Sequence, residues 1–161
     1  MSDSLGEFPS SSPEDERPIR ILLVEDNPAD VRLTHEMLRE SKVRNDLLVA
    51  HTAEEAEDIL GLPDEDAMAE EPGPRPDLML LDLNLPVKSG HDLLKEMKSH
   101  PTLRRIPVVI LSSSEAEEDV VKSYDEHANA YVTKPVDLGE ITTIVQSIDE
   151  FWFQVVRLPG K

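Results

Sequence analysis

The 161-residue chain contains no cysteine. A disulfide framework, a thiolate metal site and a cysteine nucleophile are therefore excluded, and the absence favours a reducing compartment. The longest apolar runs, Ile21–Val24 and Val108–Leu111, are far shorter than a membrane span requires, and residues 1–20 lack the apolar stretch of a signal peptide. The sequence therefore predicts a cytoplasmic protein without membrane insertion.

Basic residues are also scarce. The chain has 16 lysines and arginines against 34 acidic residues, which gives a formal net charge of -18. A diffuse polyanion such as DNA would be repelled unless a local basic patch existed, and the sequence suggests none, so we predict no direct binding of nucleic acid. Solubility explains the acidity most simply, and adaptation to a salt-rich cytoplasm is the alternative.

The chain divides into a polar leader and a patterned remainder. Residues 1–18 are rich in Ser, Pro, Glu and Asp and hold too few apolar groups to offset the entropy of ordering, so we expect a disordered leader. From residue 19 onward, apolar runs alternate with amphipathic stretches, which predicts five strand–helix units and a doubly wound α/β domain with a parallel sheet. The predicted strands are Ile19–Val24, Leu47–Ala50, Leu78–Leu81, Val108–Leu111 and Ala130–Val132.

Polar residues follow four of these five runs. In an open parallel sheet the functional crevice lies beyond the carboxyl ends of the strands, so these residues should converge at one edge. They are Glu25, Asp26 and Asn27 after the first run, Asp82 and Asn84 after the third, Ser112 after the fourth, and Thr133 and Lys134 after the fifth.

Three neighbouring carboxylates repel one another and require a counter-charge. Oxygen ligands without sulfur or histidine favour a hard cation, and Mg²⁺ is usually held by one or two carboxylates, water and substrate phosphate. We expect Asp26 and Asp82 to be direct ligands and Glu25 to lie in the outer shell. Asp82 could then attack phosphorus as a carboxylate nucleophile, and Lys134 could neutralise a phosphoryl oxygen.

Each residue also has an ordinary structural explanation. Asp26 and Asn27 precede Pro28 as a helix N-cap would, and Ser112 could cap the next helix. Lys134 alone would usually be a solvated surface residue, and Asp82 could begin a turn. Their joint occurrence at four strand ends favours a functional site over these separate explanations.

The segments Leu22–Asn27, Leu81–Pro86, Leu111–Ser112 and Val132–Pro135 resemble the receiver domains of two-component response regulators. The resemblance covers roughly residues 19–158 and implies a flavodoxin-like fold with strand order 2-1-3-4-5. It also implies a signalling protein, not an enzyme, which accepts a phosphoryl group from a histidine kinase with Mg²⁺. The implied roles are phosphoacceptor for Asp82, acidic pair for Glu25 and Asp26, metal ligand through the backbone carbonyl for Asn84, switch residues for Ser112 and Tyr131, and phosphoryl-binding amine for Lys134.

Two further segments, Ser123–Tyr131 and Phe151–Pro159, resemble the small single-domain regulators partnered with bacterial phytochromes, which implies a phytochrome-like kinase. Half of the six aromatic residues fall within residues 151–153. A contiguous exposed apolar patch usually marks an interface, so we predict a homodimer. A helix end folded back onto its own domain is the alternative. The predicted interface residues are Phe151, Trp152, Phe153 and Val155.

Three other functions compete with this interpretation. A phosphohydrolase of the haloacid-dehalogenase type also uses a strand-end aspartate and Mg²⁺, but it needs a second aspartate where this chain has Asn84. A flavodoxin-like electron carrier would bind its cofactor phosphate where Glu25 and Asp26 would repel it. A receiver-like module that binds partners without phosphorylation stays open, because an intact motif does not prove phosphoryl flux.

Overall fold

The computed structural model describes residues 18–41, 44–62, 75–112, 130–134 and 138–151. Their strands form one parallel sheet in the order β2-β1-β3-β4-β5, as predicted. The strands are β1 (Ile19–Val24), β2 (Asn45–Ala50), β3 (Leu78–Asp82), β4 (Val108–Ser112) and β5 (Ala130–Thr133). The helices are α1 (Pro28–Glu40), α2 (Ala53–Leu60), α3 (Gly90–Lys98), the 3-10 helix η1 (Leu103–Arg105) and α5 (Leu138–Phe151).

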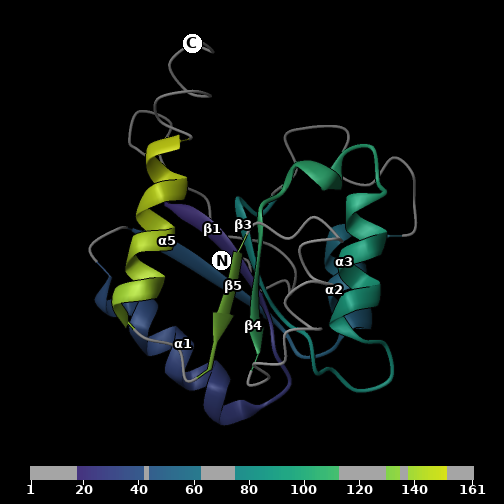
Figure 1. The fold of residues 1–161 in the computed structure, drawn as a ribbon, viewed down its shortest axis with the longest axis horizontal. Helices are drawn as coiled ribbons and strands as arrows, with labels where there is room; N and C mark the ends of the chain where they lie inside the picture. Colours follow the sequence, from purple (N-terminus) through teal and green to yellow (C-terminus); the bar gives the residue numbers. More distant parts are fainter. Residues whose placement is uncertain (1–17, 42–43, 63–74, 113–129, 135–137, 152–161) are drawn as a thin grey trace, which may run out of the picture.

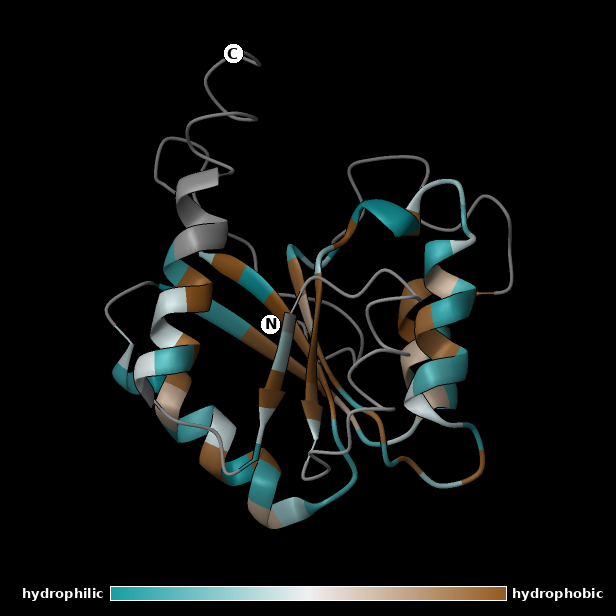
Figure 2. Cartoon of the chain, viewed as in Figure 1, coloured by the Kyte–Doolittle hydropathy of each residue, from teal (hydrophilic) through white to brown (hydrophobic). Residues whose placement is uncertain are grey.

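The helices cover both faces of the sheet (Figure 1), with α1 and α5 on one face and α2 and α3 on the other. Successive side chains of a strand point to opposite faces, so each strand contributes to two apolar clusters. Leu22 and Leu81 pack with α2 and α3, whereas Leu23 and Leu80 pack with α1 and α5. The brown colour along the strands in Figure 2 marks the hydrophobic residues that form these two clusters. Burial of both faces explains why the central strands β1, β3 and β4 are apolar over most of their length.

The strand β2 begins two residues earlier than its apolar run predicts. Asn45 and Asp46 pair with Ile19 and Arg20 of β1 and extend the ladder. An edge strand is only half-covered, so it accommodates polar residues that a central strand would exclude. The predicted leader up to residue 17 and the fourth of the five predicted helices lie outside the described residues, as do residues 63–74.

The helix α1 starts immediately beyond the end of β1. Asn27 caps it, because its Oδ1 accepts hydrogen bonds from the amides of Ala29 at 2.9 Å and Asp30 at 3.1 Å. Pro28 occupies the first helical position, where a missing N–H costs nothing. This tight connection places the first turn of α1 beside the carboxyl end of the sheet.

The connection between β3 and α3 is equally constrained. The amide of Gly90 donates to the carbonyl oxygen of Leu83 at 3.1 Å, which brings the start of α3 against the end of β3. Val87 has a φ of 66° and is 98% exposed, so a β-branched residue occupies the left-handed region. Lys88 bonds to Glu57 of α2 and, at 2.7 Å, to Glu96 of α3. These ion pairs tie the loop to both helices.

Candidate functional site

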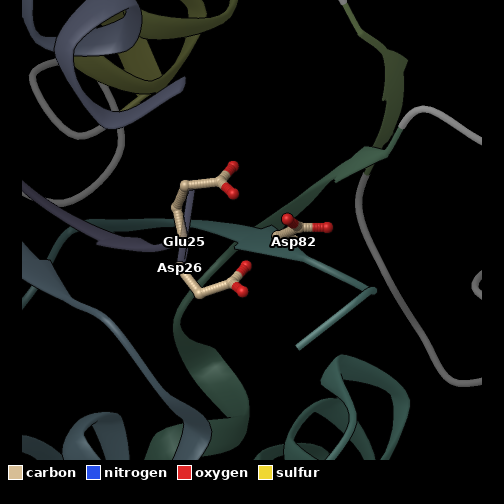
Figure 3. Close-up of side chains that lie close together, drawn as sticks. All are labelled: Glu25, Asp26 and Asp82. Atoms are coloured by element: carbon tan, nitrogen blue, oxygen red, sulfur yellow. The ribbon is translucent and has the colours of Figure 1, made fainter. Parts of the chain in front are cut away.

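Three carboxylates meet at the carboxyl end of the sheet. Glu25 and Asp26 directly follow β1 and Asp82 ends β3, and their ligand oxygens lie within 4.8 Å of one another (Figure 3). Glu25 and Asp82 are 1% and 4% exposed, whereas Asp26 is exposed. The sequence-based prediction that these side chains converge is confirmed. These three residues offer only oxygen ligands, and Asp26 is accessible to water, which fits a hard divalent cation.

The ammonium group of Lys134 lies among these carboxylates and provides a positive charge there. Its Nζ donates to Glu25 Oε1 at 2.6 Å and to Asp82 Oδ2 at 3.1 Å. The backbone amide of Lys134 donates to the carbonyl oxygen of Ser112 at 2.8 Å, so the main chain beyond β5 stays bound to β4. The side chain is 13% exposed and therefore sits in a partly desolvated setting.

A fourth carboxylate, Asp30, was not among the predicted site residues. Its Oδ2 accepts a third hydrogen bond from Lys134 Nζ at 2.9 Å, across 104 positions of the sequence. An acidic residue in a first helical turn is normally explained as a complement to the helix dipole. The feature that could have suggested a site role for Asp30 was the start of this helix immediately after β1.

Backbone amides orient two of the carboxylates. The amide of Asn84 donates to Asp82 Oδ1 at 2.9 Å, and that of Asn27 donates to Glu25 Oε2 at 3.2 Å. Asp82 therefore receives a backbone donor on one oxygen and Lys134 on the other. Such donors hold each carboxylate plane in one orientation.

Burial dominates the electrostatics of Glu25. Together with the nearby Asp82 carboxylate, burial raises the pKa of Glu25 to about 7, although Lys134 opposes the shift. Burial alone would lower the pKa of Lys134, but its hydrogen bonds to Glu25 and Asp30 outweigh that effect and raise it. Lys134 is therefore fully charged at neutral pH, while Glu25 is poised to gain or lose a proton.

The remaining predicted residues fall in different places. Ser112 is fully buried as the last residue of β4 and pairs with Thr133 of β5. Tyr131 is half-buried and packs against the apolar cluster beneath α2 and α3. Phe151 ends α5, but its side chain lies outside the described part of the chain, as do the predicted interface residues Trp152, Phe153 and Val155.

Comparisons with known proteins agree on one family. The family model for the response regulator receiver domain matches residues 21–146. The response regulator Rcp1 of Synechocystis sp. is 44% identical over 149 residues, which cover 92% of this chain and 99% of Rcp1. No helix in the described ranges is both long and apolar enough to cross a membrane.

Solved structures give the same result. The phosphorylated cyanobacterial phytochrome response regulator RcpA is 47% identical with a TM-score of 0.68, and the alignment covers 89% of this chain and 99% of RcpA. The Mn²⁺-bound form of Rcp1 is 44% identical with a TM-score of 0.67, and the alignment covers 88% of this chain and 99% of that one.

Proposed function

The chain belongs to the response regulator receiver domain family, and we propose that Asp82 is the residue on which it accepts a phosphoryl group. One observation carries this proposal. Asp82 is a nearly buried carboxylate at a strand end, oriented by the Asn84 amide and Lys134 and placed within the three-carboxylate cluster. A carboxylate in that setting is held ready for attack on phosphorus.

In the proposed reaction, an oxygen of Asp82 forms a new bond to phosphorus while the bond from phosphorus to the donor breaks. With a phosphohistidine donor the imidazole nitrogen keeps the bonding electron pair, and with acetyl phosphate the leaving acetate oxygen keeps it. Lys134 binds a phosphoryl oxygen and offsets the negative charge that the group brings. Later attack by water on phosphorus returns the free carboxylate and inorganic phosphate.

We propose that the carboxylate cluster binds Mg²⁺ as cofactor. Asp26 and Asp82 would be direct ligands, the backbone carbonyl of Asn84 a further ligand, and Glu25 an outer-shell partner. When bound, the cation neutralises the carboxylates and draws in the phosphoryl oxygens. The Mn²⁺-bound form of Rcp1 supports a divalent cation in this chain.

The partner that we propose is a sensor histidine kinase of the phytochrome type, which would meet this chain in the cytoplasm. Support comes from the 47% identity to a phytochrome response regulator that was solved in its phosphorylated form. The chain would serve as a phosphoacceptor in signal transduction and not as an enzyme acting on free substrates. Loss of the phosphoryl group would be a hydrolysis that the chain itself catalyses.

For the readout we propose Ser112 and Tyr131. Ser112 would move toward the new phosphoryl oxygens, and Tyr131 would turn into the space that it leaves. The burial of Ser112 beside the end of β5 supports a role inside the packed sheet and not at its surface. Ser112→Ala should still be phosphorylated on Asp82 but should show a smaller change in partner affinity.

We further propose a homodimer built on the end of α5 and the aromatic segment that follows it, with Phe151, Trp152, Phe153 and Val155 at the interface. The support is the concentration of aromatic residues in the sequence. Phe153→Asp should lower the sedimenting mass to that of one chain without changing the circular dichroism spectrum. A wild-type chain that stays monomeric at high concentration, phosphorylated or not, would contradict the dimer.

Phosphorylation is tested by incubating the chain with acetyl phosphate and Mg²⁺ and measuring intact mass. The wild type should gain one phosphoryl group, and Asp82→Asn should gain none. Asp92→Asn, an exposed change in the first turn of α3, is the matched control and should behave like wild type. Equal labelling of wild type and Asp82→Asn would refute the assignment. Many turnovers of a phosphate ester would favour the phosphohydrolase.

A further inference from the structure

Lys134 has no spare donor in the unphosphorylated protein. A lysine ammonium carries three N–H donors, and Lys134 uses them on Glu25, Asp82 and Asp30 at 2.6, 3.1 and 2.9 Å. A phosphoryl oxygen can bind Lys134 only if one of these carboxylates gives up its hydrogen bond. The identity of that carboxylate decides how readily the lysine is released.

The three carboxylates that bind Lys134 differ in the exposure of their side chains. The side chains of Glu25 and Asp82 are 1% and 5% exposed, whereas that of Asp30 is 35% exposed. Glu25 Oε1 or Asp82 Oδ2 would stay desolvated and lose its lysine donor if Lys134 moved away, which is costly. Asp30 can turn into water and recover its hydrogen bonds there, so it is the partner most easily released.

The backbone of Asp30 is fixed by a contact that does not involve Lys134. Its amide donates to Asn27 Oδ1 at 3.1 Å as part of the cap of α1, so release requires only a side-chain rotation. We propose that Asp30 is a positioning residue that holds Lys134 before phosphorylation and competes with the incoming phosphoryl group for it. This inference rests on the proposed function of Asp82 and Lys134.

Removal of the Asp30 charge has a distinctive consequence. Asp30→Asn weakens the competing contact and removes a negative charge close to where an anionic donor must approach. Phosphorylation should therefore become faster. Ordinary structural damage at the start of α1 would have the opposite effect, because it would disturb Glu25 and Asp26 on the preceding segment.

The chain offers a matched control in Asp92. Asp30 and Asp92 are each the third residue after a helix cap, and their amides bond to the cap side chains of Asn27 and Ser89 at 3.1 and 3.2 Å. Both are acidic residues in a first turn, but only Asp30 contacts Lys134 among the contacts of the described residues. Asp92→Asn therefore reproduces the loss of helix-dipole complement and net charge without touching the lysine.

The experiment measures the rate of Asp82 phosphorylation by acetyl phosphate at saturating Mg²⁺, by intact mass. Asp30→Asn should react about two- to fivefold faster than wild type, the range expected for a partly exposed ion pair. Asp92→Asn should match wild type, and Asp30→Glu should restore a rate close to wild type because it keeps the charge.

An Asp30→Asn rate equal to or below that of wild type would overturn the inference while leaving Asp82 as the acceptor. The same rise in Asp92→Asn would also overturn it, because net charge would then explain the effect. Failure of the wild type to become labelled would overturn the proposed function itself, and the inference with it.

Discussion

A methyl group on the α-carbon of Gly90 would lie 2.4 Å from the backbone carbonyl oxygen of Asp82. Real Cβ atoms do not approach backbone oxygens so closely, so Gly90→Ala must displace the end of β3 or the start of α3. We expect the substitution to lower the free energy of unfolding by about 1–3 kcal/mol, as overpacking of a close contact does. Urea denaturation measures the loss, and phosphorylation of Asp82 should slow with it.

Gly139→Ala is the matched control, because Gly139 is an exposed residue in the first turn of α5. Alanine favours helix there, so this change should be neutral or slightly stabilising. Equal destabilisation by both substitutions would show that the contact with Asp82 does not matter.

Val87 should be replaceable with a gain in stability. A β-branched side chain at a φ of 66° is strained, and at 98% exposure it has little packing to lose. Val87→Asn should raise the free energy of unfolding by about 0.5–1 kcal/mol, because asparagine tolerates the left-handed region. Val87→Ala, which lacks that tolerance, should gain less. A loss of stability in Val87→Asn would mean that the valine makes a favourable contact.

Lys88 should matter more for stability than an ordinary surface lysine. Its hydrogen bonds to Glu57 and Glu96 raise its pKa to about 12, and its side chain is 27% exposed. Lys88→Met leaves two carboxylates facing each other and should cost about 1–2 kcal/mol in urea denaturation. Adding Glu57→Gln should recover part of this loss. Lys95→Met, on the exposed side of α3, should cost almost nothing.

Without metal, ionisation of Glu25 should reduce the free energy of unfolding as pH rises toward neutrality. Because the pKa of Glu25 is raised from 4.5 to about 7, the folded state binds more protons than the unfolded state between these values. The contribution is therefore fully present below pH 4.5 and is lost as pH rises through about 7.

The comparison that isolates this effect is wild type against Glu25→Gln in the presence of EDTA. Relative to the variant, wild type should lose up to about 3 kcal/mol of unfolding free energy between roughly pH 5 and pH 8. Glutamine cannot ionise, so the variant lacks this component of the pH dependence. A constant difference between the two proteins across this range would contradict the raised pKa.

Lys134 and a bound cation should compete for the same oxygens. Lys134→Met frees oxygens of Glu25 and Asp82 and removes a nearby positive charge. We expect Mg²⁺ affinity to increase by about tenfold or more in calorimetric titration, since like charges at short range in a partly buried site repel strongly. Phosphorylation of Asp82 should nevertheless slow. Lys95→Met serves as the control, and weaker Mg²⁺ binding in Lys134→Met would contradict the competition.

The resemblance to receiver domains implied the sheet order, and the sequence itself predicted the convergence of Glu25, Asp26 and Asp82, because strand ends in a parallel sheet share one edge. It did not predict that Asp30 contacts Lys134. Asn27 and Pro28 indicated where the helix starts, but the contact also depends on the side-chain direction of its third residue, which hydrophobic periodicity does not give. The sequence also did not predict the ion pairs of Lys88 with α2 and α3. Lys88 and Glu57 are 31 positions apart, and periodicity does not show that their side chains meet.

Lys134 lies 109 positions from Glu25 and 52 from Asp82, and β5, which delivers it, has only four residues and pairs with β4 alone among the described strands. Synthesis proceeds from the N-terminus, so the acidic residues leave the ribosome well before their lysine does. Closing so long a loop has an entropic cost, and a four-residue edge strand makes few contacts that offset it. We therefore expect docking of β5 to be a late event in folding. A nascent chain that ends before residue 130 would hold the whole acidic cluster without the ammonium group that balances it.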